Sequence, residues 1–122
     1  MSARILFLDD EAPMCELLSG YFRDKGYEVS TATAGRTAMD LADKERFDLA
    51  VFDINIAGEN GLELLGYFKS HHPEVPVVML TGMTGGDELI EQARLRGASG
   101  FMRKTDPMDD LFAAVKSYLP AG

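Results

Sequence analysis

Residues 48–61 read DLAVFDINIAGENG, and this stretch determines how the rest of the chain is interpreted. Residues 49–52 form a short apolar run, which is typical of a strand buried on both faces. The run ends on Asp53, which is followed by a loop rich in Asn and Gly. An ionised carboxylate is costly in an apolar setting unless it is paired. The sequence therefore raises the question of which partner or reaction requires an acid at the end of this strand.

Apolar runs of the same kind recur along the chain, separated by segments with helical periodicity. The predicted strands comprise residues 5–8, 27–31, 49–52, 77–80 and 100–102. Apolar residues at helical spacing predict helices around residues 14–22, 38–42, 62–68, 89–93 and 111–119. Strands that alternate with helices indicate a parallel sheet covered on both faces. We therefore expect the α/β class and a single (βα)5 domain.

Proline and glycine residues agree with these boundaries. Pro13 suits the first turn of the first helix, and Gly26 suits its C-terminal end. Gly97 is expected to close the fourth helix. Asp106 and Pro107 predict an N-cap followed by a first-turn proline in the fifth helix.

The bulk composition narrows the possible functions. The chain has 122 residues, and we expect residues 1–122 to form one compact domain. Its net charge of −8 argues against nucleic-acid binding by this domain, because phosphate backbones are held by clusters of Lys and Arg. A single cysteine cannot form an intrachain disulfide, and the apolar runs are too short to span a bilayer. Without a signal-peptide pattern, a cytoplasmic protein that does not contact the membrane is expected.

Charged or hydroxyl side chains follow most of the predicted strands. Because parallel strands end at the same edge of a sheet, we expect these side chains to converge. Each has an ordinary structural explanation alone, such as a charge that complements a helix dipole. Together, however, clustered acids repel one another and require a cation, and a donor set made of oxygens suits Mg²⁺. The set is Asp9, Asp10 and Glu11 after the first strand, Asp53 after the third, Thr81 after the fourth and Lys104 after the fifth.

A hydroxyl and an ammonium beside a metal site indicate phosphoryl-group chemistry. Phosphoryl transfer depends on positioning and on neutralising the oxygens of the transferred group. A carboxylate at the centre of such a site can itself be the nucleophile. We therefore interpret Asp53 as an acid that binds Mg²⁺ and attacks phosphorus.

Four segments resemble the receiver domain of bacterial two-component response regulators. They are ILFLDDE, LAVFDINIAGENGLELL, VPVVMLTG and GASGFMRKTDP, and together they cover nearly the whole chain. The resemblance implies a flavodoxin-like, doubly wound sheet of five parallel strands in the order 2-1-3-4-5. It also implies a signalling domain that catalyses only its own phosphorylation and dephosphorylation, and that receives the phosphoryl group from a histidine kinase or a histidine phosphotransfer protein.

The resemblance also assigns roles to individual residues. It implies that the signal leaves through the face of the fourth helix, fifth strand and fifth helix, toward an output partner or domain that the sequence does not identify. By this resemblance, Asp53 is the phosphoacceptor and Lys104 is the lysine that binds the phosphoryl group. Asp10 is a direct Mg²⁺ ligand, its neighbour Asp9 often acts through water, and Asn55 provides a main-chain carbonyl ligand. Thr81 is the switch hydroxyl and Phe101 is the switch aromatic.

Three positions depart from the family pattern. The usual Met-Pro after the phosphoacceptor is Ile56-Ala57 here, and Phe101 lacks the hydroxyl group of a tyrosine. The family usually has Lys-Pro with a cis bond where this chain has Lys104-Thr105. A cis bond before a non-proline residue costs about 3 kcal/mol. We therefore expect a trans bond, with Lys104 still within salt-bridge reach of Asp53.

Three alternatives compete with a phosphorylated receiver. A phosphatase with an aspartyl-phosphate intermediate would need a second acid two residues after the nucleophile, where this chain has Asn55. A flavodoxin-like cofactor carrier would need a first loop that cradles phosphate, whereas DDEAP at residues 9–13 would repel it. A pseudo-receiver that cannot be phosphorylated is disfavoured because every site position is filled.

Overall fold

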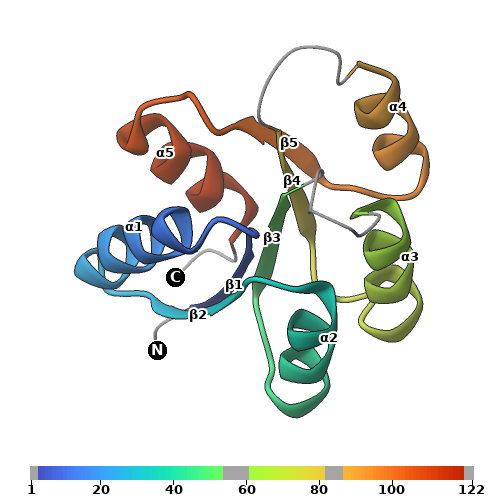
Figure 1. Ribbon diagram of the computed structural model, residues 1–122, viewed down its shortest axis with the longest axis horizontal. Helices are drawn as coiled ribbons and strands as arrows, with labels where there is room; N and C mark the ends of the chain where they lie inside the picture. The colour runs from blue at the N-terminus through green and yellow to red at the C-terminus, as the bar shows by residue number, and fades with distance from the viewer. Residues whose placement is uncertain (1–2, 54–60, 82–86, 120–122) are drawn as a thin grey trace.

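The computed structural model describes residues 3–53, 61–81 and 87–119, and the structural statements below concern these residues. Five parallel strands form one sheet in the order β2-β1-β3-β4-β5 (Figure 1). The predicted α/β class and strand order are therefore confirmed. The strands are β1 (Arg4–Leu8), β2 (Glu28–Ala32), β3 (Leu49–Asp53), β4 (Val77–Thr81) and β5 (Gly100–Arg103), and the helices are α1 (Ala12–Asp24), α2 (Gly35–Lys44), α3 (Gly61–His71), α4 (Asp87–Leu95) and α5 (Met108–Tyr118).

The helices cover both faces of the sheet (Figure 1). One face packs against α1 and α5 through residues such as Phe22 and Val115, and the other packs against α2, α3 and α4. Successive residues of a strand point to opposite faces, so Phe7 belongs to the first cluster and Leu6 to the second. Double coverage explains why β3 and β4 are buried along their whole length. Among the described residues, the helices lack the combination of length and hydropathy that crossing a bilayer would require.

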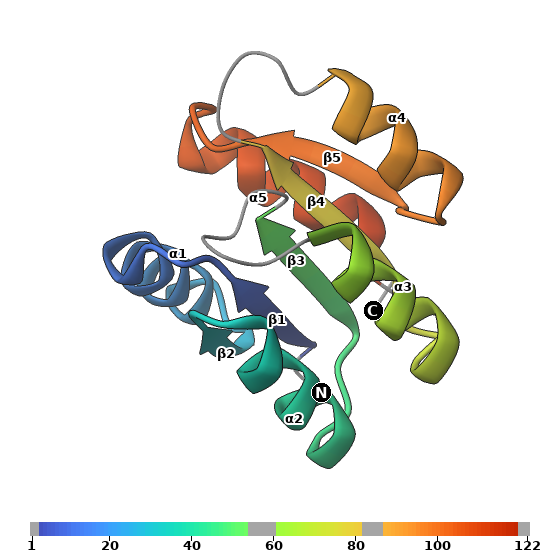
Figure 2. The same ribbon diagram turned by 45° about the vertical axis from the view of Figure 1, so that its right-hand side comes forward.

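The strand ends bring the candidate residues to one edge of the sheet. The arrowheads of the strands point toward the same edge in Figure 2. Strands β3 and β4 each extend one residue beyond the predicted apolar run, because Asp53 pairs with Leu80 and Thr81 pairs with Arg103. Asp53 and Thr81 are thus the last residues of paired strands, and the sheet fixes their backbone positions.

Aromatic packing holds β3 directly before Asp53. The Phe52 side chain is fully buried, and its ring centroid lies 4.7 Å from that of Phe68 in an edge-to-face contact. Such contacts add to the free energy gained by burying apolar area. The acid therefore follows a tightly packed segment of the core.

Most of the predicted helix boundaries are confirmed, with one correction. Pro13 lies in the first turn of α1, and Gly26 and Gly97 have φ values of 97° and 104°, which favour glycine. The N-cap of α5, however, is Pro107 rather than Asp106. Asp106 lies in the preceding turn, and the first helical hydrogen bonds, donated by the N–H groups of Asp110 and Leu111, go to the carbonyl of Pro107.

A close contact joins β5 to the end of α5. Gly100 is the first residue of β5, and a Cβ atom placed on it would overlap the hydroxyl end of the Tyr118 ring. The missing side chain of Gly100 is what allows the phenol to lie against the strand.

Candidate functional site

Asp53 is almost completely buried at the end of β3, with 2% of its surface exposed. Its Oδ2 atom accepts a hydrogen bond of 2.7 Å from Nζ of Lys104. This contact answers the question that the sequence raised, because the attraction of the ammonium offsets part of the cost of burying the carboxylate.

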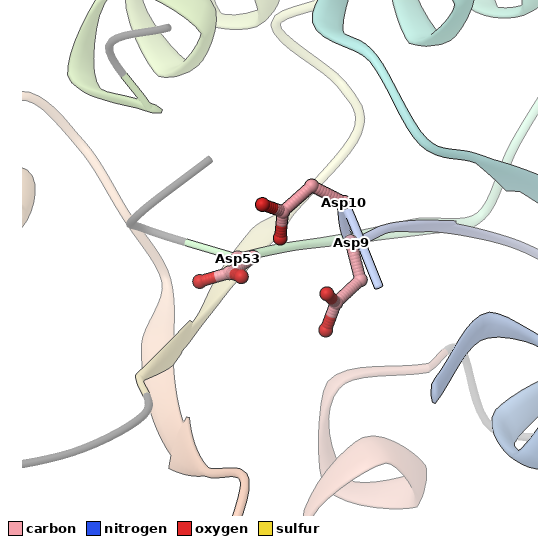
Figure 3. Close-up of side chains that lie close together, drawn as sticks. All are labelled: Asp9, Asp10 and Asp53. Carbon is pink, nitrogen blue, oxygen red and sulfur yellow. The ribbon is translucent and has the colours of Figure 1, made fainter. Parts of the chain in front are cut away.

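Asp9 and Asp10 follow β1 and lie beside Asp53. Figure 3 shows the side chains gathered at the ends of β1 and β3, with the Asp10 carboxylate turned toward Asp53. One ligand atom from each of the three acids lies within 4.8 Å of the others. Asp9 is 1% exposed, and its N–H donates to the Ala32 carbonyl, which extends the pairing of β1 with β2. The convergence predicted from the strand ends is therefore present.

A buried thiol lies behind this loop. Sγ of Cys15, in α1, lies 3.3 Å from the Asp9 carbonyl oxygen. Burial, followed by the nearby Asp9 charge, raises the pKa of Cys15 above its usual 9.0. The thiol therefore stays protonated and helps to hold the backbone of Asp9.

Lys104 connects three carboxylates. Its Nζ atom lies 2.7 Å from Asp53 Oδ2, 2.9 Å from Asp9 Oδ2 and 3.0 Å from Glu11 Oε1. Burial alone would lower the pKa of Lys104, but its contacts with the acids outweigh this effect and raise the pKa above its usual 10.5. The ammonium thus remains charged at neutral pH.

The path of the chain after β5 places this lysine. The Lys104 N–H donates to the Thr81 carbonyl at 2.8 Å, which continues the pairing of β4 with β5. No cis peptide bond occurs within the described residues, so the trans bond expected for Lys104-Thr105 is confirmed. The lysine stem reaches Asp53 from this backbone position, as the sequence predicted.

Thr81 ends β4 and Phe101 lies within β5, and the contacts described for both side chains are with groups other than the acids. Thr81 is 7% exposed, and its hydroxyl donates to the Met102 carbonyl at 3.3 Å. Phe101 is partly buried and packs against the cluster on the α2, α3 and α4 face. Asn55 and Ile56-Ala57 belong to residues 54–60, which lie outside the described part of the chain.

The contact between Glu11 and Lys104 was not predicted. Glu11 and Lys104 were expected at the same edge of the sheet, but the sequence did not specify that these two residues, 93 positions apart, would pair. Its side chain is 66% exposed. The sequence shows that Glu11 follows two acids at the predicted start of a helix, but this position does not specify where the Glu11 side chain points.

The acids have the donor chemistry and the excess charge that suit Mg²⁺. Three carboxylates, those of Asp9, Glu11 and Asp53, contact the Lys104 ammonium, and Asp10 lies beside Asp9 and Asp53, so four acids and one ammonium give this edge a formal charge of −3. Asp9 Oδ2 is buried, and no donor of the described residues gives it a well-aligned hydrogen bond. Its contact with Lys104 is an ion pair only. A hard divalent cation bound by Asp9, Asp10 and Asp53 would satisfy this oxygen and offset the repulsion.

A family model for the response regulator receiver domain matches residues 5–116. Sporulation initiation phosphotransferase F of Bacillus subtilis is 33% identical over 120 residues, which cover 98% of this chain and 96% of that protein. The chain therefore belongs to the family of response regulator receiver domains, which are signalling domains of two-component systems. This membership confirms the resemblance seen in the sequence motifs and supports a receiver over a phosphatase or a flavodoxin-like carrier.

Two further proteins show the range of the family. The nitrogen assimilation regulatory protein NtrX of Azorhizobium caulinodans is 39% identical over 113 residues, which cover 91% of this chain but 25% of that protein. The crystal structure of the response regulator TrrA of Thermotoga maritima, in complex with Mg²⁺ and BeF, has a TM-score of 0.85 and 29% identity, and the match covers 96% of this chain and 99% of that one. The chain thus matches some relatives almost end to end and spans about a quarter of another.

Proposed function

We propose that this receiver domain accepts a phosphoryl group on Asp53 in a reaction that depends on Mg²⁺. The observation that supports this role most directly is the position of the Asp53 carboxylate, buried at the sheet edge, 2.7 Å from Lys104 and within reach of Asp9 and Asp10. Bound Mg²⁺ would offset the negative charge of the acids and of the phosphoryl oxygens.

In the proposed transfer, an Asp53 oxygen forms a bond to phosphorus while the bond from phosphorus to the donor breaks. The electron pair of that bond leaves with the donor group, an imidazole if the donor is a phosphohistidine. Lys104 donates a hydrogen bond to a phosphoryl oxygen and neutralises part of its charge. The carboxylates of Asp9 and Asp10 would hold the metal ion, and the carbonyl of Asn55 is the further ligand that the family resemblance assigns.

We propose a histidine kinase or a histidine phosphotransfer protein as the donor. Family membership supports this donor class, and the relative named a phosphotransferase is consistent with it. The crystal structure of TrrA, a similar protein, is a complex with Mg²⁺ and BeF, which is consistent with a site that binds this metal ion. Within this proposal, residues 1–122 act as one cytoplasmic receiver domain, which catalyses only its own phosphorylation and dephosphorylation.

The response to phosphorylation would begin at Thr81. Its hydroxyl now donates to the Met102 carbonyl, so turning toward a phosphoryl oxygen would release a contact with β5. Phe101 precedes Met102 in this strand and packs toward the helices on the other face. We propose that these two residues change the face made by α4, β5 and α5, where an output partner or domain would bind.

Incubation with acetyl phosphate and Mg²⁺ tests the phosphoacceptor. Intact-mass measurement of the wild type should show one phosphoryl adduct, and Asp53→Asn should show none. Asp48→Asn is the matched control, because Asp48 lies at the opposite end of β3, where its carboxylate accepts a hydrogen bond from the Arg4 N–H. An undiminished adduct in Asp53→Asn would exclude Asp53 as the acceptor.

A further inference from the structure

The ammonium of Lys104 has as many carboxylate neighbours as it has N–H groups. Hydrogen bonds join it to Asp53 and Glu11, and an ion-pair contact joins it to Asp9. An ammonium has three donors and no acceptor, so two donors are used in these hydrogen bonds, and Asp9 Oδ2 takes up further space 2.9 Å from Nζ. A phosphoryl oxygen that binds Lys104 therefore competes with carboxylates that already surround the ammonium.

Glu11 is the neighbour that can withdraw most easily. The side chains of Asp9 and Asp53 are 1% and 3% exposed, whereas that of Glu11 is 66% exposed. An exposed carboxylate is readily hydrated when it leaves an ion pair, and such pairs contribute little stability. The buried acids have no comparable access to solvent.

The backbone of Glu11 is fixed while its side chain remains exposed. Its N–H donates to Asp9 Oδ1 at 2.9 Å, and its carbonyl accepts the first hydrogen bonds of α1. Glu11 is the N-cap residue, but in the described structure its side chain makes no capping hydrogen bond. Short side chains such as Ser or Asp are the usual caps. Helix capping thus does not account for a glutamate here, whereas the contact with Lys104 does.

We propose that Glu11 is a positioning residue that occupies one donor of Lys104 until an anionic phosphodonor displaces it. This inference rests on the function proposed for Asp53. The reaction itself is unchanged: with acetyl phosphate, the new bond joins Asp53 to phosphorus, and the electron pair of the broken bond leaves with acetate. Glu11 opposes the approach of the donor, both by holding Lys104 and by its own negative charge.

The proposal predicts an effect on donor binding rather than on the transfer step. Glu11→Gln keeps the length of the side chain but removes its charge. The half-saturating concentration of acetyl phosphate should fall about two- to fivefold, the range for an exposed ion pair, with the maximal rate unchanged. The difference in half-saturating concentration between Glu11→Gln and wild type should shrink in high salt, because Glu11 is exposed and salt screens its charge.

Initial rates of adduct formation, measured by intact mass at saturating Mg²⁺, provide the test. Glu16→Gln is the matched control, since it removes the same charge from an exposed position further along α1. It should leave the half-saturating concentration unchanged. A less anionic donor, phosphoramidate, should show a smaller difference between Glu11→Gln and wild type.

Each outcome bears on the proposal. Equal half-saturation for Glu11→Gln and wild type at low salt would overturn the role of Glu11 and leave the role of Asp53 intact. A lower maximal rate in Glu11→Gln would also overturn it, since Glu11 would then assist the transfer. Absence of an adduct on every protein would overturn the proposed function, and this inference with it.

Discussion

Replacing Lys104 by methionine should reveal how far the resting site depends on one cation. The variant keeps a long apolar stem but leaves the carboxylates of Asp9 and Asp53 without their ammonium partner. Removing one member of a buried ion pair costs about 3–5 kcal/mol, because the remaining charge stays desolvated. The Lys104 side chain is 16% exposed, and water at the sheet edge can hydrate part of the exposed charge.

We therefore expect the free energy of unfolding to fall by about 3 kcal/mol, near the low end of that range. For a chain of this size, each kcal/mol changes the melting temperature by about 3–5 °C, so the midpoint should fall by about 10 °C. The pKa of Lys104 is raised above 10.5 in the folded protein. The stability that a raised basic pKa contributes is fully present below the unfolded value and is lost only as pH rises through the folded one. The Lys104 contribution should thus be constant between about pH 7 and pH 9.

Urea unfolding in the absence of Mg²⁺ is the appropriate assay. Lys44→Met is the control, because Lys44 is an exposed residue in the last turn of α2 and its loss should change stability by no more than about 0.5 kcal/mol. Adding Mg²⁺ should stabilise Lys104→Met more than wild type, since the acids of the variant have lost the ammonium. If Lys104→Met were as stable as Lys44→Met, the reasoning about the loss of the ammonium would be wrong.

Two further predictions concern the metal and the switch. Mg²⁺ at about ten times its Kd should stabilise the wild type by about 1.4 kcal/mol, and Asp10→Ala should lose most of that gain in a thermal melt; an equal gain in both would argue against Asp10 as a ligand. Beryllofluoride with Mg²⁺ should shift amide resonances across residues 89–111, because Thr81 would release the Met102 carbonyl; shifts confined to the acidic loop would contradict the switch. Two-dimensional NMR of the labelled chain measures this response.

The fold was largely predictable because its pattern is local. Apolar runs that alternate with helical periodicity define a parallel sheet, and a sheet with both faces covered requires its strands to be apolar throughout. The acid at position 53 stood out for this reason, since it follows such a run. The N-cap of α5 was misassigned by one residue, because Asp106 and Pro107 fit a cap and first turn equally well in sequence, and the tertiary path of the turn decides between them.

The candidate site was predictable only in part. Topology brought Asp9, Asp10, Asp53 and Lys104 to one edge, since parallel strands end together. The order of the strands does not determine the directions in which side chains point. The pairing of Lys104 with Glu11 and the hydrogen bond from Thr81 to Met102 depend on rotamers that neighbouring elements select.

The contact between Gly100 and Tyr118 gives β5 a mechanical connection to the far end of α5. Because the phenol occupies the space of a missing side chain, Gly100 cannot move toward α5 without pushing its last turn. Phe101 is the next residue in the strand. A small displacement of the β5 backbone at Phe101 would therefore move Gly100 against the Tyr118 ring and shift the end of α5. Close-packed interiors transmit such displacements rather than absorb them. If phosphorylation changes β5 as proposed, the last turn of α5 is therefore a second place, besides the side chain of Phe101, where the change would reach the surface.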